Sequence, residues 1–253
     1  MSKTSTNVKA TSNSLHTSIK GKTTDISNKI EKSGVSEDDR DKIMSPFSRT
    51  TDPNSSYGST EIEKAWDRAI DKDPSLKTEK ENLIKYETSV NSAIKDKYDK
   101  SDSLWRGTSD REVDHIIKTD RVEPYGYQSV SMTVDKDAGM GFGKNASGID
   151  GVTIEFDKNK LETHKDGMYR AEPELVNYSV FRDHVGTSEE KSGKYPISYA
   201  DEMEVRTNPF THAKDNIKSI TIHKSEFMSK SDTDSLFTKY TNAFPKSKII
   251  ING

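Results

Sequence analysis

The chain has 253 residues, of which 32% are charged and 30% hydrophobic, with a net charge of −3 and no cysteine. This charge balance gives no general attraction to nucleic acid or to an anionic membrane, and the lack of cysteine excludes disulfides, thiolate catalysis and cysteine-bound zinc. The longest purely aliphatic run, Ile249-Ile250-Ile251, is too short to span a bilayer. Because the N-terminus lacks the apolar stretch of a signal peptide, we expect a soluble protein that is secreted or injected, if at all, by a non-classical route.

The first 56 residues are rich in serine, threonine, lysine, asparagine and aspartate, and Phe47 is their only aromatic residue. Such a composition buries too little apolar surface to offset the entropy of ordering the chain. We therefore predict a flexible polar leader over residues 1–56 and a folded domain over residues 57–253. Within the leader, Ser36 followed by three acidic residues is typical of a helix N-cap and indicates a short helix through Met44.

Two helices are predicted at the start of the folded domain. The first begins at Ser59 or Thr60 and is broken by the segment Asp73-Pro74-Ser75. The second runs from about Thr78 to Tyr98. Both have apolar side chains near helical spacing, which predicts ordinary core-facing stripes: Ile62, Trp66, Ala69 and Ile70 in the first, and Leu83, Ile84, Tyr86, Val90, Ala93, Ile94 and Tyr98 in the second.

The remainder of the domain is predicted to consist of short strands with helices between them. The strands are expected over Ser103–Thr108, Tyr127–Val134, Gly151–Phe156, a segment through Glu202, Ile217–His223 and Lys248–Ile251, and Glu174–Val180 is expected to form another strand or a short helix. Short helices are expected over Asp110–Ile117 and Asp135–Phe142. Because helices come first and strands later, the fold class is α+β rather than a doubly wound α/β fold.

An acidic segment, Asp201 to Glu204, lies directly before a β-prone run. In a strand, side chains alternate between faces, so Glu202, Glu204 and Arg206 would project to one side and Met203 and Val205 to the other. Two carboxylates two residues apart on a strand are roughly 6–7 Å from each other. That spacing lets both carboxylates act on one bound substrate.

Three further segments precede this pair of carboxylates in the chain: Trp105-Arg106-Gly107, Ser129-Val130-Ser131 and Ala138 to Gly143. In order and spacing, the set resembles the arginine–serine–glutamate class of mono-ADP-ribosyltransferases, which includes bacterial exotoxins and phage enzymes. The family has an aromatic-Arg-Gly strand, a Ser-Thr-Ser strand and a Glu-x-Glu motif. The chain departs from this pattern at Val130, where the family has threonine.

The resemblance covers roughly Tyr57 to His223 and implies a fold and an activity. It implies a helical N-terminal part followed by a mainly antiparallel β-sandwich of the ADP-ribosyltransferase type, with residues 57–253 as the catalytic domain. The expected reaction moves ADP-ribose from NAD, the substrate, to a side chain of an acceptor protein. Family members with glutamate at the first position of Glu-x-Glu usually modify arginine, so Glu202 suggests an arginine acceptor.

The chemistry of the reaction assigns roles to the site residues. Cleavage of the nicotinamide–ribose bond passes through an oxocarbenium-like sugar, and Glu204 is the candidate carboxylate that stabilises it. Arg106 is the candidate for the pyrophosphate, since its planar fork meets phosphate oxygens. Ser129, with Ser131 as helper, would hold the glutamate or the ribose. Glu202 would orient the incoming nucleophile or accept its proton.

Three further residues are candidates for nucleotide contacts. Phe142 corresponds to an aromatic that the family places against nicotinamide, and a plain core phenylalanine is the alternative. Gly107 would let its backbone approach the nicotinamide amide, and a simple strand-end glycine is the alternative. Lys144 is the nearest basic residue to the position where the family contacts phosphate, although it offers a point charge rather than a fork.

Other site types are not expected. The segment Gly139 to Gly143 is not a Gly-x-Gly-x-x-Gly fingerprint, so we expect no Rossmann site. The six histidines never fall at i, i+3 or i+4 spacing, so we predict no metal site. Two other functions stay open: an NAD glycohydrolase that uses water as acceptor, and a non-catalytic virion or structural protein on the same scaffold.

Overall fold

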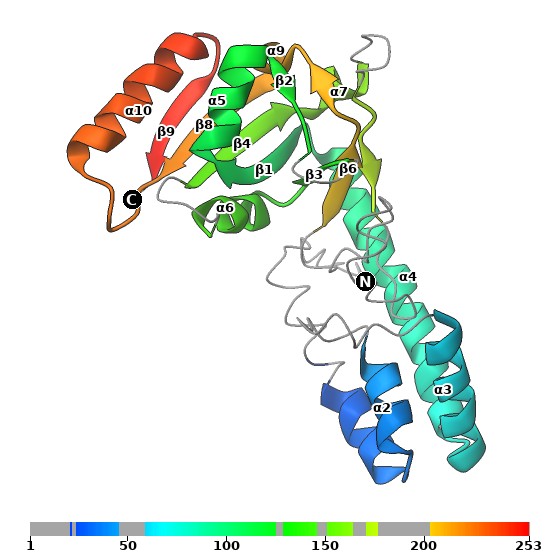
Figure 1. The fold of residues 1–253 in the computed structure, drawn as a ribbon. Helices are drawn as coiled ribbons and strands as arrows, with labels where there is room; N and C mark the ends of the chain where they lie inside the picture. Colours follow the sequence, from blue (N-terminus) through cyan, green and yellow to red (C-terminus); the bar gives the residue numbers. More distant parts are fainter. Residues whose placement is uncertain are drawn as a thin grey trace, which may run out of the picture.

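The computed structural model describes residue 21 and residues 24–45, 59–124, 129–145, 151–163, 171–176 and 203–252 (Figure 1). Its elements are mixed: helices dominate the first part of the chain, and a mainly antiparallel sheet dominates the second. The expected α+β class with helices before strands is therefore confirmed at this level. None of the described helices is long and apolar enough to cross a membrane.

The N-terminal helices are α2 (Glu37–Met44), α3 (Ser59–Lys72) and α4 (Leu76–Lys100), and residues 24–32 are also helical. Figure 1 shows α3 and α4 side by side, with α4 reaching from the sheet and α2 near its far end. The two long helices confirm the predicted pair, because Ile62, Trp66 and Ala69 of α3 are buried as the spacing predicts. Ile84 of α4, also predicted to face the core, is 50% exposed.

Residues 24–45 lie inside the expected leader but are folded. Ile26, Ile30 and Ile43 are at most 3% exposed, and Ser36 caps α2 by accepting from the Asp39 amide. The Asp39 carboxylate also accepts from Arg68 of α3 at 3.1 Å, so α2 is tied to α3 by both apolar and ionic contacts. A few well-spaced isoleucines are enough to bury this segment, although its average composition is polar.

Within the described residues, the central sheet has seven strands in the order β5-β6-β3-β1-β4-β8-β9. All neighbouring pairs are antiparallel except β8–β9, which is parallel and is joined by α10 (Lys230–Ala243). The strands are β1 (Ser103–Ser109), β3 (Val130–Thr133), β4 (Gly151–Asp157), β5 (Glu174–Leu175), β6 (Glu204–Thr207), β8 (Ile217–His223) and β9 (Lys248–Asn252). A two-stranded ribbon pairs β2 (Arg121–Val122) with β7 (Phe210–Thr211).

The two faces of the sheet differ in character. Leu104, Ile154 and Phe156 share the apolar face, where Phe156 packs edge-on against Phe210 of β7 with ring centroids 5.7 Å apart. Trp105 and Thr153 point to the opposite face, which carries more polar side chains and is covered by α6 (Lys136–Lys144). The other helices of the described part of the chain are α5 (Asp110–Thr119), α7 (Lys158–Thr163) and α9 (Ala213–Asn216).

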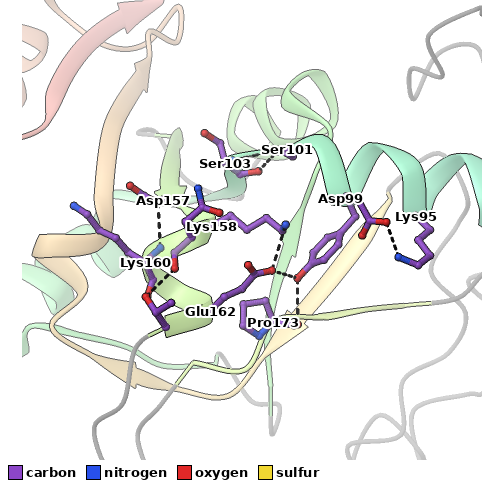
Figure 2. A network of polar contacts seen from close by, with 12 residues as sticks. Lys95, Asp99, Ser101, Ser103, Asp157, Lys158, Lys160, Glu162 and Pro173 are labelled. Atoms are coloured by element: carbon purple, nitrogen blue, oxygen red, sulfur yellow. Dashed lines mark hydrogen bonds and ion pairs between the residues drawn. The ribbon is translucent and has the colours of Figure 1, made fainter.

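A polar network fixes the end of α4 to the sheet (Figure 2). The Tyr98 hydroxyl donates to Glu162 Oε1 of α7 at 2.9 Å. Lys158 Nζ lies 3.2 Å from the same carboxylate oxygen and 4.1 Å from the centre of the Tyr98 ring. Burial, followed by the bond to Glu162, raises the pKa of Tyr98 above its ordinary value. The network orients α4 just before it enters β1.

The predicted strands are recovered where the structure describes them, but three sequence-based predictions need comment. Helix α10 was not predicted. Helix α6 extends beyond the predicted end at Phe142 and includes Gly143 and Lys144 in its last turn. The segment 174–180, expected to be a strand or a short helix, is described only through residue 176 and begins as a strand, and Glu202 lies outside the described residues.

Candidate functional site

The candidate residues come from three neighbouring strands, β1, β3 and β6. In the register between β3 and β6, Ser131 faces Arg206 and Thr133 faces Glu204. Directly paired residues on adjacent strands project to the same face of a sheet. Ser131, Glu204 and Arg206 therefore lie on one face, and their side chains meet there.

Glu204 is the centre of this group. Its side chain is 8% exposed, and its Oε1 accepts from the Ser131 hydroxyl at 2.6 Å. Arg206 donates from Nε to Oε1 at 3.0 Å and from Nη2 to Oε2 at 3.2 Å. A carboxylate removed from water needs such donors, because burial of an unpaired charge is costly. The expectation that Glu204 and Arg206 share a side of the strand is confirmed.

The backbone just before Glu204 has an unusual conformation. Met203 has φ 46°, in the left-handed region that residues other than glycine rarely adopt. Its side chain is fully buried, and its carbonyl accepts from the Val134 amide at 3.3 Å. Strand alternation therefore ends at Glu204 and does not predict the direction of Glu202, which lies outside the described residues. Strained backbone of this kind is concentrated at functional sites.

Arg106 is held by three hydrogen bonds to two groups. Its Nε donates to Glu112 Oε1 at 2.8 Å and its Nη2 to Glu112 Oε2 at 3.1 Å. Its Nη1 donates to the Ser131 carbonyl oxygen at 2.7 Å. Glu112, in the first turn of α5, is 2% exposed and also accepts from the Thr108 hydroxyl. The Arg106 guanidinium, which was expected to bind a pyrophosphate, is thus bound to a buried carboxylate.

The position of Arg106 follows from how β1 and β3 pair. The two strands share the register pair Trp105–Thr133, while β1 continues along β4 for its whole length. Beyond that pair, the Arg106 guanidinium takes the place of a backbone donor for the Ser131 carbonyl. As a result Arg106, Ser131 and Glu204 are linked by hydrogen bonds across three strands.

The serine in this link is Ser131. The sequence predicted Ser129 as the main serine and Ser131 as its helper. Ser129 precedes β3, whereas Ser131 lies inside it and donates to Glu204. A shift of two residues keeps the face of a strand unchanged, so alternation alone could not choose between them.

The packing of α6 against β1 requires a glycine at position 107. A Cβ at Gly107 would collide with Phe142 and with the backbone of Gly143, so glycine is needed there for α6 to approach the sheet. Gly143 and Gly151 are equally tight against their neighbours. Phe142 is 43% exposed, which differs from the alternative of a plain core phenylalanine.

A buried histidine lies beneath the last turn of α6. His223 Nε2 is 2.8 Å from the Thr153 hydroxyl oxygen, which in turn donates to the Gly139 carbonyl at 3.1 Å. Because the single hydroxyl proton of Thr153 goes to Gly139, His223 donates from Nε2. Burial, and secondarily the charge of Lys144, lowers the pKa of His223. The charge of Lys144 therefore affects the pKa of His223, and Lys144 is also the candidate residue for contacting phosphate.

Two residues of the site were not assigned a role from the sequence, Glu112 and Arg206. Glu112 lies six residues after Arg106, across the β1–α5 turn, and only the fold brings the two together. Arg206 was expected on the Glu204 side, but its pairing with that carboxylate was not. The i, i+2 spacing of opposite charges in a predicted strand was the available signal.

Comparison with protein-family models, with curated proteins and with solved structures found no match. Within the described ranges, no three histidine, aspartate or glutamate side chains are grouped so that they could hold a metal ion. The interpretation of the site therefore depends on the geometry of Arg106, Ser131, Glu204 and Arg206 themselves.

Proposed function

We propose that the protein is an NAD-dependent mono-ADP-ribosyltransferase that transfers ADP-ribose to a protein side chain, in particular arginine. The observation that carries the proposal is the continuous link from Arg106 through Ser131 to Glu204. These are the three residue types that define the arginine–serine–glutamate class. They come from separate parts of the sequence and lie on adjacent strands. The side chains of Ser131 and Glu204 project to one face of the sheet, and Arg106 binds the backbone carbonyl of Ser131 from the other face.

The chemistry requires a carboxylate beside the reacting ribose. The bond between C1′ of the ribose and the nicotinamide nitrogen breaks, and its electron pair leaves with nicotinamide. Glu204 stabilises the cationic sugar that remains, which is differential binding of the transition state. The Ser131 hydroxyl holds Oε1 of Glu204 at 2.6 Å, so the carboxylate is oriented before substrate arrives.

The second half of the reaction needs an acceptor. A guanidinium nitrogen of the acceptor protein forms the new bond to C1′ and gives up a proton, and Glu202 is the residue proposed to receive it. Arginine depends strongly on such a base because it is protonated at all ordinary pH values. The role of Glu202 is assigned by the resemblance alone.

The same proposal extends to the fold type. A sandwich of the ADP-ribosyltransferase kind requires the sheet to separate near the serine strand. The single register pair between β1 and β3 is consistent with that separation. Phe142 and Lys144 of α6 are proposed to line the nucleotide side of the site, and Gly107 allows α6 to reach it.

The experiment is a transfer assay with labelled NAD and a cell lysate. The purified wild type is compared with Glu204→Gln and with Glu226→Gln, a matched change at an exposed glutamate in the loop after β8. We expect a labelled protein band with the wild type and the Glu226 variant, and none with the Glu204 variant. Free nicotinamide is measured in the same tubes.

Each outcome assigns the function differently. Glu204-dependent release of nicotinamide without a labelled band, repeated with lysates of different origin, favours the glycohydrolase. Absence of both signals, with no heat of NAD binding in calorimetry, contradicts an NAD enzyme and favours a non-catalytic protein. A labelled band that persists in the Glu204 variant contradicts the assigned site.

A further inference from the structure

Two arginines contact the proposed site, and their partners differ. Arg106 is bound to Glu112 of α5 and to the Ser131 carbonyl, so each of its three nitrogens is engaged by the fold. Arg206 instead donates from Nε and Nη2 to Glu204, the carboxylate proposed to act on ribose. The guanidinium next to the reacting group is therefore that of Arg206.

The contact between Arg206 and Glu204 is enclosed. The Arg206 side chain is 14% exposed and that of Glu204 is 8% exposed. A guanidinium fork fixes both the position and the plane of a carboxylate, whereas a lysine ammonium fixes only a distance. Together with the Ser131 hydroxyl on Oε1, the fork leaves the carboxylate little rotational freedom.

The short sequence spacing between Arg206 and Glu204 limits what their ion pair can stabilise. Arg206 and Glu204 are two residues apart on the same strand, so their pairing joins no separate elements of the fold. By contrast, Arg106–Glu112 joins β1 to α5. An ion pair between two neighbours on one strand acts mainly by orienting its own side chains, and the Ser131 hydroxyl of β3 holds the same carboxylate.

We propose that Arg206 is a positioning residue that sets the orientation of the Glu204 carboxylate for cleavage of the nicotinamide–ribose bond. The inference rests on the proposed function and deepens it. In this assignment, Arg206 supplies the guanidinium that contacts the reacting carboxylate. Arg106 holds β3 in place through the Ser131 carbonyl. Arg206 acts through Glu204, so its loss affects the chemical step more than the binding of NAD.

The test measures nicotinamide release from NAD at steady state by the full-length wild type, Arg206→Lys, Arg206→Gln and Arg111→Gln, the last being a matched change at an exposed arginine of α5. A misplaced reacting group costs about 100-fold in rate, so we expect kcat of Arg206→Gln to fall by about that factor. KM for NAD stays within about threefold, since uniform binding is untouched. Arg206→Lys recovers part of kcat, and Arg111→Gln matches the wild type.

Three results would overturn the assignment. A large rise in KM with unchanged kcat would make Arg206 a direct substrate contact. Unchanged kcat and KM in both Arg206 variants would mean that the Arg206–Glu204 pair has no role in catalysis. A thermal midpoint of Arg206→Lys far below that of the wild type, with kcat lost in proportion to unfolded protein, would make the role structural. Failure of the wild type to release nicotinamide in a Glu204-dependent way would instead overturn the proposed function, and the inference with it.

Discussion

Two arginine–glutamate pairs of the same chemistry lie on either side of β3. Arg106–Glu112 connects β1 to α5, and Thr108 adds a hydrogen bond from its hydroxyl. Arg206–Glu204 lies within β6, and the Ser131 hydroxyl of β3 donates to the same carboxylate. The first pair holds the fold, whereas the second holds a carboxylate in place. Substitutions in the two pairs should therefore separate stability from activity.

The largest effect on stability is expected from Glu112→Ala. This change leaves the guanidinium of Arg106, 12% exposed, without its carboxylate. Breaking one partner of a buried ion pair costs about 3–5 kcal/mol. Urea unfolding of the variant would measure the loss. A loss below about 1 kcal/mol, the size of a surface pair, would mean that Arg106–Glu112 does not hold the fold.

Glu204→Gln should affect activity more than stability. Glutamine keeps an acceptor for the Ser131 hydroxyl and loses only the charge that faces Arg206. We expect the free energy of unfolding to fall by about 1.5–3 kcal/mol, because hydrogen bonds to charged groups are worth about that much. Nicotinamide release should disappear. A variant as unstable as Glu112→Ala would show that both pairs serve the fold, and the comparison would fail.

The two serines provide a sharper test of the site. Ser131→Ala removes the hydroxyl that donates to Glu204, so we expect nicotinamide release to fall by about 10-fold, the effect of losing about 1.4 kcal/mol of transition-state binding. Ser129→Ala should change the rate by less than about twofold. The opposite ranking would restore Ser129 as the serine of the motif and shift the site by two residues.

The smallest effect concerns pH. The buried, neutral His223 has its pKa held below its ordinary value of 6.5 by burial and then by Lys144. The unfolded chain therefore binds the proton more readily than the folded one. This contribution to stability is complete above pH 6.5 and is lost as the pH falls through the lower folded pKa. The thermal midpoint of the wild type should fall more steeply than that of His223→Gln between about pH 7.5 and 5.5. Parallel curves would contradict this account.

Local patterns were sufficient to predict much of the fold. The stripe Ile62, Trp66, Ala69 located α3, and alternation in Ile217–His223 located β8. The predictions that failed depended on weaker local signals. Helix α10 begins at a capping box of Ser229 and Asp232. That pattern was in the sequence, but the helix carries too many polar residues for its stripe to stand out.

The site could be predicted only in part, for a geometric reason. Residue types and order pointed to Arg106, a serine of the Ser129 to Ser131 segment, and Glu204. Pairing of β3 with β6 was needed to choose Ser131, since two-residue shifts preserve the face. The partners of the two arginines required the fold as well, because Glu112 reaches Arg106 only across the turn into α5.

The most direct test is the rate of nicotinamide release from NAD by the wild type and by Glu204→Gln, measured beside urea unfolding of both. We expect steady release by the wild type and none by the variant, while the free energies of unfolding of the two proteins differ by no more than about 3 kcal/mol. Equal release by both, or none by a folded wild type, would contradict the claim that Glu204 is the catalytic carboxylate of an NAD-cleaving site.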